Sequence, residues 1–351
     1  MDAATLPSHR DHRCEAEDVE SLTIWILAAV GVTVLAVAVA IAVHDFFEGE
    51  NLIHDLVDEW RLRRRTLEDF DAQWSAAPRR SEVIVSLTTI PSRLPHLEWT
   101  LKSLMRQTVA PARIVLNLPR FSRREGCAYE VPERLRTLAA VEIREVEDLG
   151  PATKLVPTLL AEPADRMIVT LDDDRIYPAK LIETLERAAR ADPDGAFAFG
   201  GWIVPADYVD RPTTVASNFF MRPPAPVRAT RLGAPKAVDV PLGFCGYLVR
   251  PRFFDLAALT DWSAAPDCAF FVDDVWIGAH CRADIRVVPS RLSNYQPKLL
   301  RPFYRETSLG RINRGSGGHE MRHNTIVLRH FRNVWRVGGD RLARTGSTRR
   351  S

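Results

Sequence analysis

The longest apolar stretch lies near the N-terminus. Residues 22–43 carry no charged side chain, and as a helix they would span roughly 33 Å, which matches the hydrocarbon core of a bilayer. Trp25 stands near one edge, where an indole suits the membrane interface. About twenty mostly polar residues come first, unlike the short basic start of a secretory signal. We therefore predict an N-terminal tail at 1–21 and one transmembrane helix at 22–43.

The next segment, residues 44–80, is charged but carries apolar residues at helical spacing, from Leu52 through Trp60 to Leu67. We interpret it as a juxtamembrane stalk. Four arginines between 61 and 65 outnumber the two that precede the apolar span. The positive-inside rule therefore favours a single-pass protein with a cytoplasmic domain, while a domain in the lumen of a secretory compartment stays open.

From residue 83 onward, short β-branched runs alternate with helical periods. The runs predict strands at 83–88, 113–118, 141–146, 167–171, 196–203 and 285–288. The periods predict helices at 95–107, 132–139, 154–160, 178–191, 253–259 and 273–281. Such alternation is typical of βαβ units, so we predict an α/β fold with a Rossmann-type mixed, mostly parallel sheet flanked by helices. This domain would cover 81–337, followed by a flexible basic tail at 338–351.

Ligands of parallel sheets bind beyond the carboxyl ends of the strands. Residues 86–93, Asn117 and residues 172–174 fall at such ends. Residues 205–236 hold many prolines and arginines without any period, and we predict that they form a loop over a binding cleft.

Composition narrows the function classes. The chain is 46% hydrophobic and 26% charged with a net charge of +2, which indicates a folded protein and gives no support to a nucleic-acid partner. The five cysteines are scattered and never spaced as CxxC. They suggest neither a disulfide framework nor a zinc site; we expect mostly buried thiols, and a single disulfide stays open.

Three consecutive carboxylates, Asp172 to Asp174, follow an apolar strand. Carboxylates this close repel one another unless a positive charge lies between them. In an extended chain Asp172 and Asp174 project to the same side, where they could hold Mn²⁺ or Mg²⁺ and leave room for phosphate oxygens. The alternative is a solvated acidic turn in which Asp174 caps the next helix.

The run belongs to an ordered set of motifs: VSLTTIPSR at 85–93, LNLP at 116–119, GPATK at 150–154 and FVDDVWIG at 271–278. Together they resemble the GT-A-fold glycosyltransferases, specifically a family 2-like group, over residues 83–288. The resemblance implies a GT-A-like fold. It also implies transfer of a sugar from a nucleoside-diphosphate sugar to a hydroxyl of a glycan, lipid or protein.

The resemblance also implies roles for individual residues. Asp172 and Asp174 would be the metal-binding DxD pair, with Asp173 facing the sugar or ribose. The other donor-binding residues would be Thr88, Thr89, Pro91, Arg93, Asn117 and Lys154. Asp273 or Asp274 would supply the catalytic base of an inverting displacement, with Asp274 favoured. The acceptor side would include Gly243 and Gly246; Trp276 is a further acceptor-side candidate from its residue type alone.

Two assignments have ordinary alternatives. His319, after a glycine-rich run, could be a third metal ligand as in some GT-A enzymes, or a surface histidine. Trp202 and Trp276 could stack on a sugar or belong to the core.

Other function classes compete with this interpretation. A dehalogenase-type phosphatase needs DxDxT, and Ile176 stands at the threonine position. A metal-dependent nucleotidyltransferase would also hold a divalent cation with such carboxylates, but it would release pyrophosphate. A catalytically inactive, membrane-tethered binding protein of GT-A-like fold is the non-enzymatic alternative, and it is disfavoured because both acidic sites are intact.

Overall fold

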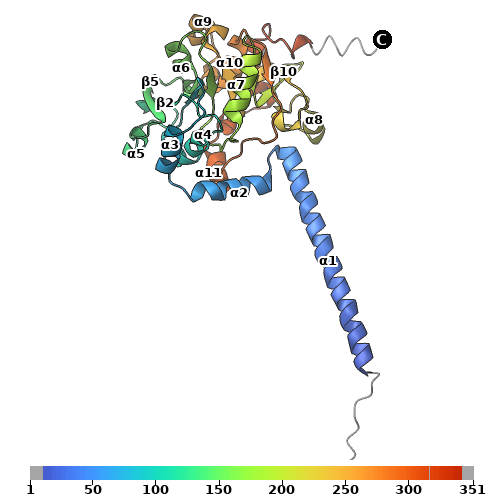
Figure 1. Ribbon diagram of the computed structural model, residues 1–351. Coiled ribbons are helices and arrows are strands. Elements are labelled where there is room, and N and C mark those ends of the chain that lie inside the picture. Colours follow the sequence, from blue (N-terminus) through green and yellow to red (C-terminus); the bar gives the residue numbers. More distant parts are fainter. Residues whose placement is uncertain (1–10, 316, 342–351) are drawn as a thin grey trace, which may run out of the picture. The chain divides into compact units, whose positions relative to one another are not determined.

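The computed structural model describes residues 11–315 and 317–341, which form two compact units that meet between Glu48 and Gly49. The first unit is the single helix α1 (Asp11–Glu48), seen in Figure 1 as one uninterrupted rod. Its part Leu22–Glu48 is long and apolar enough to cross a membrane. The predicted span lies within α1, but the helix begins earlier, inside the segment predicted as a tail.

The second unit is built on an eight-stranded sheet within the described residues. Its order is β10-β13-β7-β12-β6-β1-β2-β5, with all strands parallel except β12 and β10. The predicted α/β class with a mixed, mostly parallel sheet is thus confirmed. The strands, in sheet order, are Lys236–Val238, Ile285–Val287, Ala196–Ala198, Tyr247–Val249, Ile168–Thr170, Ile84–Leu87, Arg113–Pro119 and Val141–Val146.

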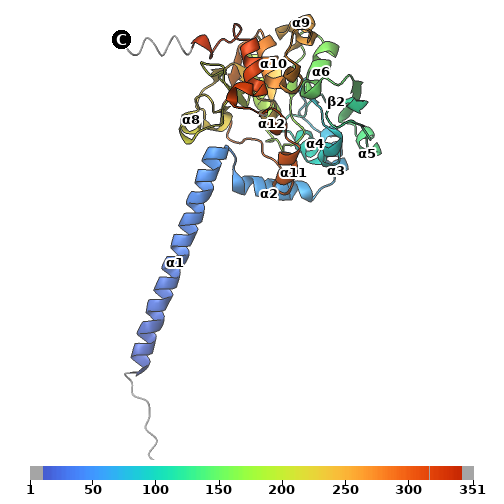
Figure 2. The ribbon, with the colours of Figure 1, turned by 180° about the vertical axis from the view of Figure 1, so that it is seen from behind.

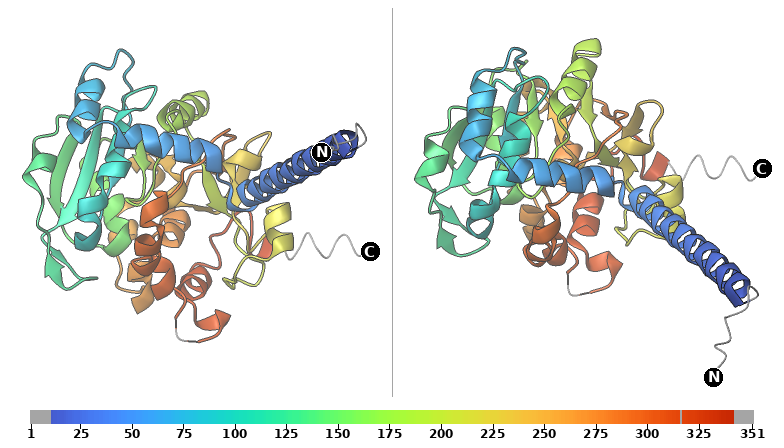
Figure 3. Two further views of the ribbon diagram at one scale, coloured as in Figure 1. Left: turned by 90° about the horizontal axis from the view of Figure 1, so that it is seen from below. Right: turned by 60° about the horizontal axis from the view of Figure 1, so that its bottom comes forward.

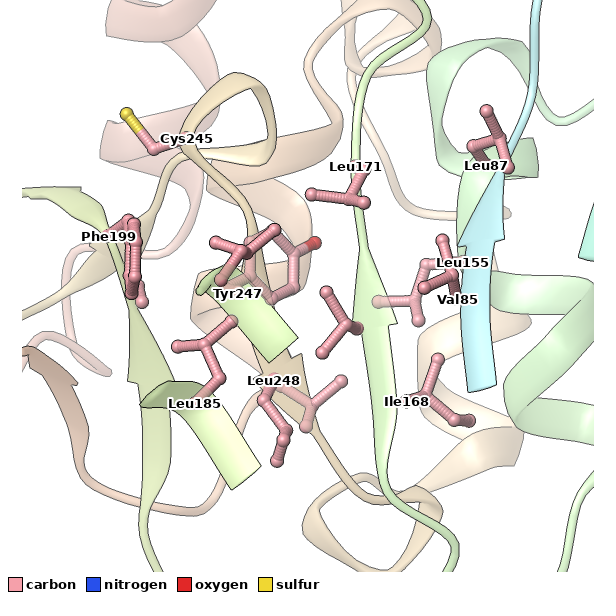
Figure 4. Packing of buried hydrophobic residues seen from close by; sticks show 14 of the residues in the cluster. Val85, Leu87, Leu155, Ile168, Leu171, Leu185, Phe199, Cys245, Tyr247 and Leu248 are labelled. Atoms are coloured by element: carbon pink, nitrogen blue, oxygen red, sulfur yellow. The ribbon is translucent and has the colours of Figure 1, made fainter. Parts of the chain in front are cut away.

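Helices flank this sheet on both sides (Figures 1 and 2). The described α-helices of the second unit are α2 (Leu52–Arg63), α3 (Leu67–Ser75), α4 (Glu98–Met105), α5 (Glu133–Arg136), α6 (Val156–Ala161), α7 (Leu181–Ala191), α8 (Val215–Phe220), α9 (Leu256–Thr260), α10 (Asp273–His280), α11 (Arg301–Glu306), α12 (Leu309–Ile312) and α13 (His323–His330). Side chains from strands and helices interlock between the layers. Figure 4 shows Leu155 beside Val85 of β1, and Leu185 of α7 beside Leu248 of β12.

The segment predicted as a stalk differs from that prediction. Residues 49–80 belong to the second unit and form α2 and α3. Thr66 caps α3 through a reciprocal capping box with Asp69. Phe70 and Trp74 of α3 are buried in the core, and the Trp74 indole donates to the Pro111 carbonyl at 3.0 Å. A stalk would leave these aromatic rings in water, so burial ties the segment to the domain.

The region after residue 195 departs from the prediction. The single strand predicted at 196–203 is two strands, β7 and β8 (Gly200–Trp202), and they belong to different sheets. β8 pairs with β9 (Val227–Arg228) and β11 (Val240–Pro241) in a small antiparallel sheet. A two-stranded hairpin of β3 (Phe121–Ser122) and β4 (Cys127–Ala128) completes the strands.

The cysteines follow the expectation in part. Cys245 and Cys281 are buried, Cys268 is half-buried, and Cys127 is exposed on the β3–β4 hairpin. All four are free thiols, and burial raises the pKa of Cys281 to about 11. Of the predicted tail, residues 342–351 lie outside the described residues, whereas the Gly338 N–H is held by Asp239 Oδ2 at 2.8 Å.

Gly246 immediately precedes β12, which pairs with β6 in the sheet. Its φ is +86°, and a Cβ there would lie 2.6 Å from Leu171 Cδ2. Only glycine adopts this backbone conformation without strain. The residue therefore allows the antiparallel strand β12 to enter the sheet next to β6.

We expect Gly246→Ala to destabilise the fold, because a side chain in this backbone region costs about 1–3 kcal/mol. Thermal unfolding of the full chain in detergent should show a clear fall in Tm. Gly233→Ala is the matched control, since a Cβ at Gly233 meets nothing within 4 Å. Equal Tm values for the two variants would contradict the packing described here.

Candidate functional site

A cavity of about 420 Å³ lies at the carboxyl ends of the parallel strands, a volume in the range of small-molecule sites. It is lined by the loop after β1, the loop after β6, the turn before α6 and the start of α10. The predicted residues among its lining are Thr88, Thr89, Arg93, Lys154, Asp172, Asp173, Asp174, Asp273 and Asp274.

Lys154 is the centre of this arrangement. Its buried Nζ lies 2.7 Å from Asp172 Oδ1, 2.7 Å from Asp273 Oδ2 and 3.3 Å from Asp274 Oδ1. Burial alone would lower the pKa of Lys154, but the three carboxylates outweigh it and raise that pKa well above its ordinary value. The two acidic motifs, about a hundred residues apart in sequence, thus share one ammonium group.

Gly243 lets the chain approach this ammonium group closely. A Cβ on Gly243 would lie 2.0 Å from Lys154 Nζ and 3.0 Å from Asp172 Oδ1. The Gly243 N–H donates to the Asp274 carboxylate, at 3.0 Å to Oδ2 and 3.1 Å to Oδ1. The glycine predicted for the acceptor side therefore supports the acidic cluster through its backbone.

Asp274 is the more accessible of the two aspartates that begin α10. Its side chain is 22% exposed, against 11% for Asp273. Burial raises the pKa of Asp274 to about 8; Lys154 opposes this shift, and the neighbouring Asp273 and Asp172 add to it. A carboxyl group whose pKa is raised in this way approaches the pKa range of general bases that work near neutral pH.

Asp173 faces away from Lys154 into a second network. Arg93 Nη1 donates to its Oδ1 at 2.8 Å, and the Thr89 hydroxyl donates to its Oδ2 at 2.5 Å. Arg93 also donates to Thr307, at 3.0 Å to Oγ1 and 2.9 Å to the carbonyl. Burial raises the pKa of Asp173, and the Arg93 guanidinium opposes this shift. The middle aspartate thus positions the Arg93 side chain at the cavity.

Asp174 and Asp172 each keep an oxygen outside these networks. Gln296 Nε2 donates to Asp174 Oδ2 at 2.9 Å, while the buried Asp174 Oδ1 has no hydrogen bond and lies 3.5 Å from Arg175 Nε. Asp172 is partly exposed and contacts Lys154 through Oδ1. Six aspartates and four basic residues line the cavity, so negative charge is in excess.

These observations fit a divalent cation. Magnesium is commonly held by one or two carboxylates with substrate phosphates and water as the other ligands. Asp174, which has one oxygen without a hydrogen bond, and the partly exposed Asp172 could provide such a pair. Among the described residues, no group of three His, Cys, Asp or Glu side chains is arranged to hold an ion by itself.

Several predicted residues lie elsewhere. His319 is exposed and does not line the cavity. Trp276 is buried in the core, stacked on Trp262 with ring centroids 3.9 Å apart, and its indole donates to the Leu259 carbonyl. It therefore presents no face to a sugar, because neighbouring elements enclose it.

Other predicted residues support the site from behind. Asn117 is fully buried and donates to Ser86 Oγ at 3.1 Å and Thr158 Oγ1 at 3.0 Å. Thr88 donates to the Asn117 carbonyl at 2.7 Å. Pro91 begins the 3₁₀ helix Pro91–His96 that carries Arg93, and it does not itself line the cavity.

Some lining residues were not predicted. Arg124 donates to the Thr307 carbonyl, and the Tyr129 hydroxyl donates to the Thr89 carbonyl at 2.8 Å. The segment from Ser308 to Asn313 closes another side, together with Gln296. No spacing pattern in the sequence marks these residues. Trp202, which was considered for sugar stacking, does line the cavity. The loop at 205–236, predicted to cover a cleft, contributes nothing to the lining.

Comparison with known proteins adds little to this description. No family model matches the sequence, and no curated protein matches it. Among solved structures, S. aureus TarS 1–349 matches with 12% identity and a TM-score of 0.38, covering 71% of this chain and 69% of that chain. A likeness at this level carries no argument about activity, so function is inferred from the site.

The raised pKa of Asp274 predicts a pH dependence of stability. Between the ordinary carboxyl pKa near 3.9 and about 8, folded Asp274 holds a proton that the unfolded chain releases. This contribution to stability is therefore present at low pH and is lost as pH rises through about 8.

We expect the Tm of the wild-type chain, in detergent with EDTA, to fall between about pH 6 and pH 9 more steeply than that of Asp274→Asn, by about 2 °C or more. Differential scanning calorimetry measures this difference. An equal or steeper fall for the variant would contradict the assigned environment of Asp274.

Proposed function

We propose that the protein is a membrane-anchored, metal-dependent glycosyltransferase that moves a sugar from a nucleoside-diphosphate sugar to a hydroxyl of a glycan, lipid or protein, with inversion. The observation that carries the proposal is the convergence of two acidic segments on Lys154. One segment ends β6 and the other begins α10, and both face one cavity at the carboxyl edge of the sheet.

The donor side would be the region between Asp172, Asp174 and Arg93. Asp172 and Asp174 would hold Mn²⁺ or Mg²⁺, which when bound would offset the negative charge that develops on a leaving diphosphate. Arg93 and Arg124 line the same cavity and present cationic groups that suit phosphate oxygens. The Asp173 and Thr307 contacts hold the Arg93 guanidinium in place, which limits its reorganisation when a substrate binds.

The acceptor side would use Asp274. The acceptor oxygen attacks the anomeric carbon, the bond from that carbon to the diphosphate oxygen breaks, and the acceptor proton passes to the Asp274 carboxylate. The nucleoside diphosphate leaves with the bonding electron pair. Lys154 lies between this base and Asp172, so it can offset charge on either side of the reaction. A single displacement with one base gives inversion.

Metal dependence is tested by nucleotide binding. We expect titration calorimetry of the full chain in detergent, across UDP, GDP and CMP, to show one nucleotide that binds at least about tenfold more tightly with Mn²⁺ or Mg²⁺ than with EDTA. Asp172→Asn and Asp174→Asn should each lose this increment. Asp267→Asn is the control, because Asp267 is exposed and lies outside the cavity lining.

An unchanged affinity on adding metal to the wild-type chain would contradict the metal assignment. Retention of the full increment in both Asp172→Asn and Asp174→Asn would contradict the choice of ligands.

The catalytic base is tested by turnover. We expect Asp274→Asn to lower kcat by about 10²–10⁴, the usual contribution of general base catalysis, while nucleotide affinity stays near that of the wild type. Measuring both quantities separates a loss of the base from a loss of the donor site. A large fall in Asp273→Asn alone would move the role to Asp273, and normal kcat in both variants would exclude this pair.

A further inference from the structure

Helix α2 has its polar side turned toward the protein. Asp55, Asp58 and Glu59 are buried against the domain. The Asp58 carboxylate accepts hydrogen bonds from both terminal nitrogens of Arg106 and, at 3.0 Å, from the Tyr295 hydroxyl. These contacts fix the rotation of α2 about its own axis.

A second set of contacts extends this attachment to the segment before α11. Glu59 accepts from the Lys298 backbone N–H at 2.9 Å, and Asp55 accepts from Lys298 Nζ at 3.2 Å. The helix is thus held along its length by hydrogen bonds and ion pairs, with Leu62 as its buried apolar contact.

The opposite side of α2 is apolar and faces outward. Its exposed side chains are Ile53 at 61%, Leu56 at 51%, Val57 at 43% and Trp60 at 51%. Their spacing of three and four residues places them in one stripe. A surface helix of a water-soluble domain has the reverse orientation, with apolar residues inward. An exposed apolar patch that is bordered by polar residues marks a site of contact with a membrane or another molecule.

The surroundings of the stripe match a lipid interface. Leu299, 72% exposed, follows Lys298 in the segment that α2 contacts. Arg61, Arg63, Arg64 and Arg65 lie at the C-terminal end of α2, and the Arg64 guanidinium is 3.7 Å from the centre of the Trp60 ring. Tryptophan and arginine together are typical of the headgroup region, where cations meet lipid phosphates. Figure 3 shows α2 lying along one face of the domain.

We propose that α2 lies in the interface of the bilayer that α1 crosses, with Ile53, Leu56, Val57 and Trp60 inserted among the lipids. Three residues, 49–51, separate the end of α1 from the start of α2, so at most about 10 Å of chain lies between them. Interfacial helices combine such an apolar stripe with flanking basic residues. The proposal rests on the membrane span in α1 that belongs to the proposed function.

This arrangement would orient the catalytic domain. Because the buried carboxylates of α2 are bonded to Arg106, Tyr295 and Lys298, the helix and the domain move as one body. Insertion of the stripe would therefore hold the acidic cavity in one orientation relative to the lipid headgroups.

The test is photo-crosslinking of the full chain in vesicles of anionic and zwitterionic phospholipid that carry a fluorescent lipid. The variants are Trp60→p-benzoylphenylalanine and Leu56→p-benzoylphenylalanine. The matched control is Leu160→p-benzoylphenylalanine. Leu160 is 53% exposed, and its helix α6 lies at the far end of the domain from α2 in Figures 1 and 2. Val34→p-benzoylphenylalanine in α1 reports the membrane span itself.

We expect lipid adducts at positions 34, 56 and 60, with yields at 56 and 60 at least about tenfold above that at 160. Adducts at 34 with none at 56 and 60 would overturn the proposal while leaving the membrane anchor intact. A crosslinked dimer, or an adduct with another protein, at 56 and 60 would show a protein partner in place of lipid. Absence of an adduct at position 34 would contradict the membrane span in α1, and the proposal for α2 would fail with it.

Discussion

The site depends on one buried cation, Lys154, held among three carboxylates. An unpaired ammonium group in this position would be strongly destabilising, and three unpaired carboxylates would repel one another. Together they tie the turn before α6, the loop after β6 and the start of α10 into one cluster. Gly243 is required there because its missing side chain leaves room for the ammonium group.

The three aspartates after β6 have different environments because of this cluster. Asp172 pairs with Lys154, Asp173 pairs with Arg93, and Asp174 contacts Gln296 with one oxygen left without a hydrogen bond. Asp173 and Asp174 lie in a turn, not in the extended chain assumed from the sequence, and the three side chains have different partners. Under the proposed function Asp172 and Asp174 would hold the metal ion, while Asp173 positions Arg93. The Arg93 network then connects the motif to the late segment around Thr307.

Sequence periodicity predicted the central strands of the sheet, because β1, β2 and β6 are short β-branched runs that are buried in the sheet. It also placed Asp172 at the site, since strand ends converge at one edge of a parallel sheet, whereas Asp274, at the start of α10, was assigned from the family resemblance; both line the cavity. It failed for Trp276, whose burial depends on Trp262, and for Gln296, which reaches Asp174 through tertiary packing alone. It also missed the docking of α2, which was predicted to be part of a stalk, because that helix is attached to the domain by buried carboxylates.

The chemistry of the leaving group separates glycosyl transfer from the nucleotidyl transfer that the same acidic residues could serve. The most direct measurement is chromatography of the products after the full chain in detergent is incubated with Mn²⁺ and either a panel of nucleotide sugars or the nucleoside triphosphates with sugar phosphates. Glycosyl transfer predicts release of a nucleoside diphosphate from one donor. Release of pyrophosphate from a nucleoside triphosphate, with every nucleotide sugar left intact, would contradict it.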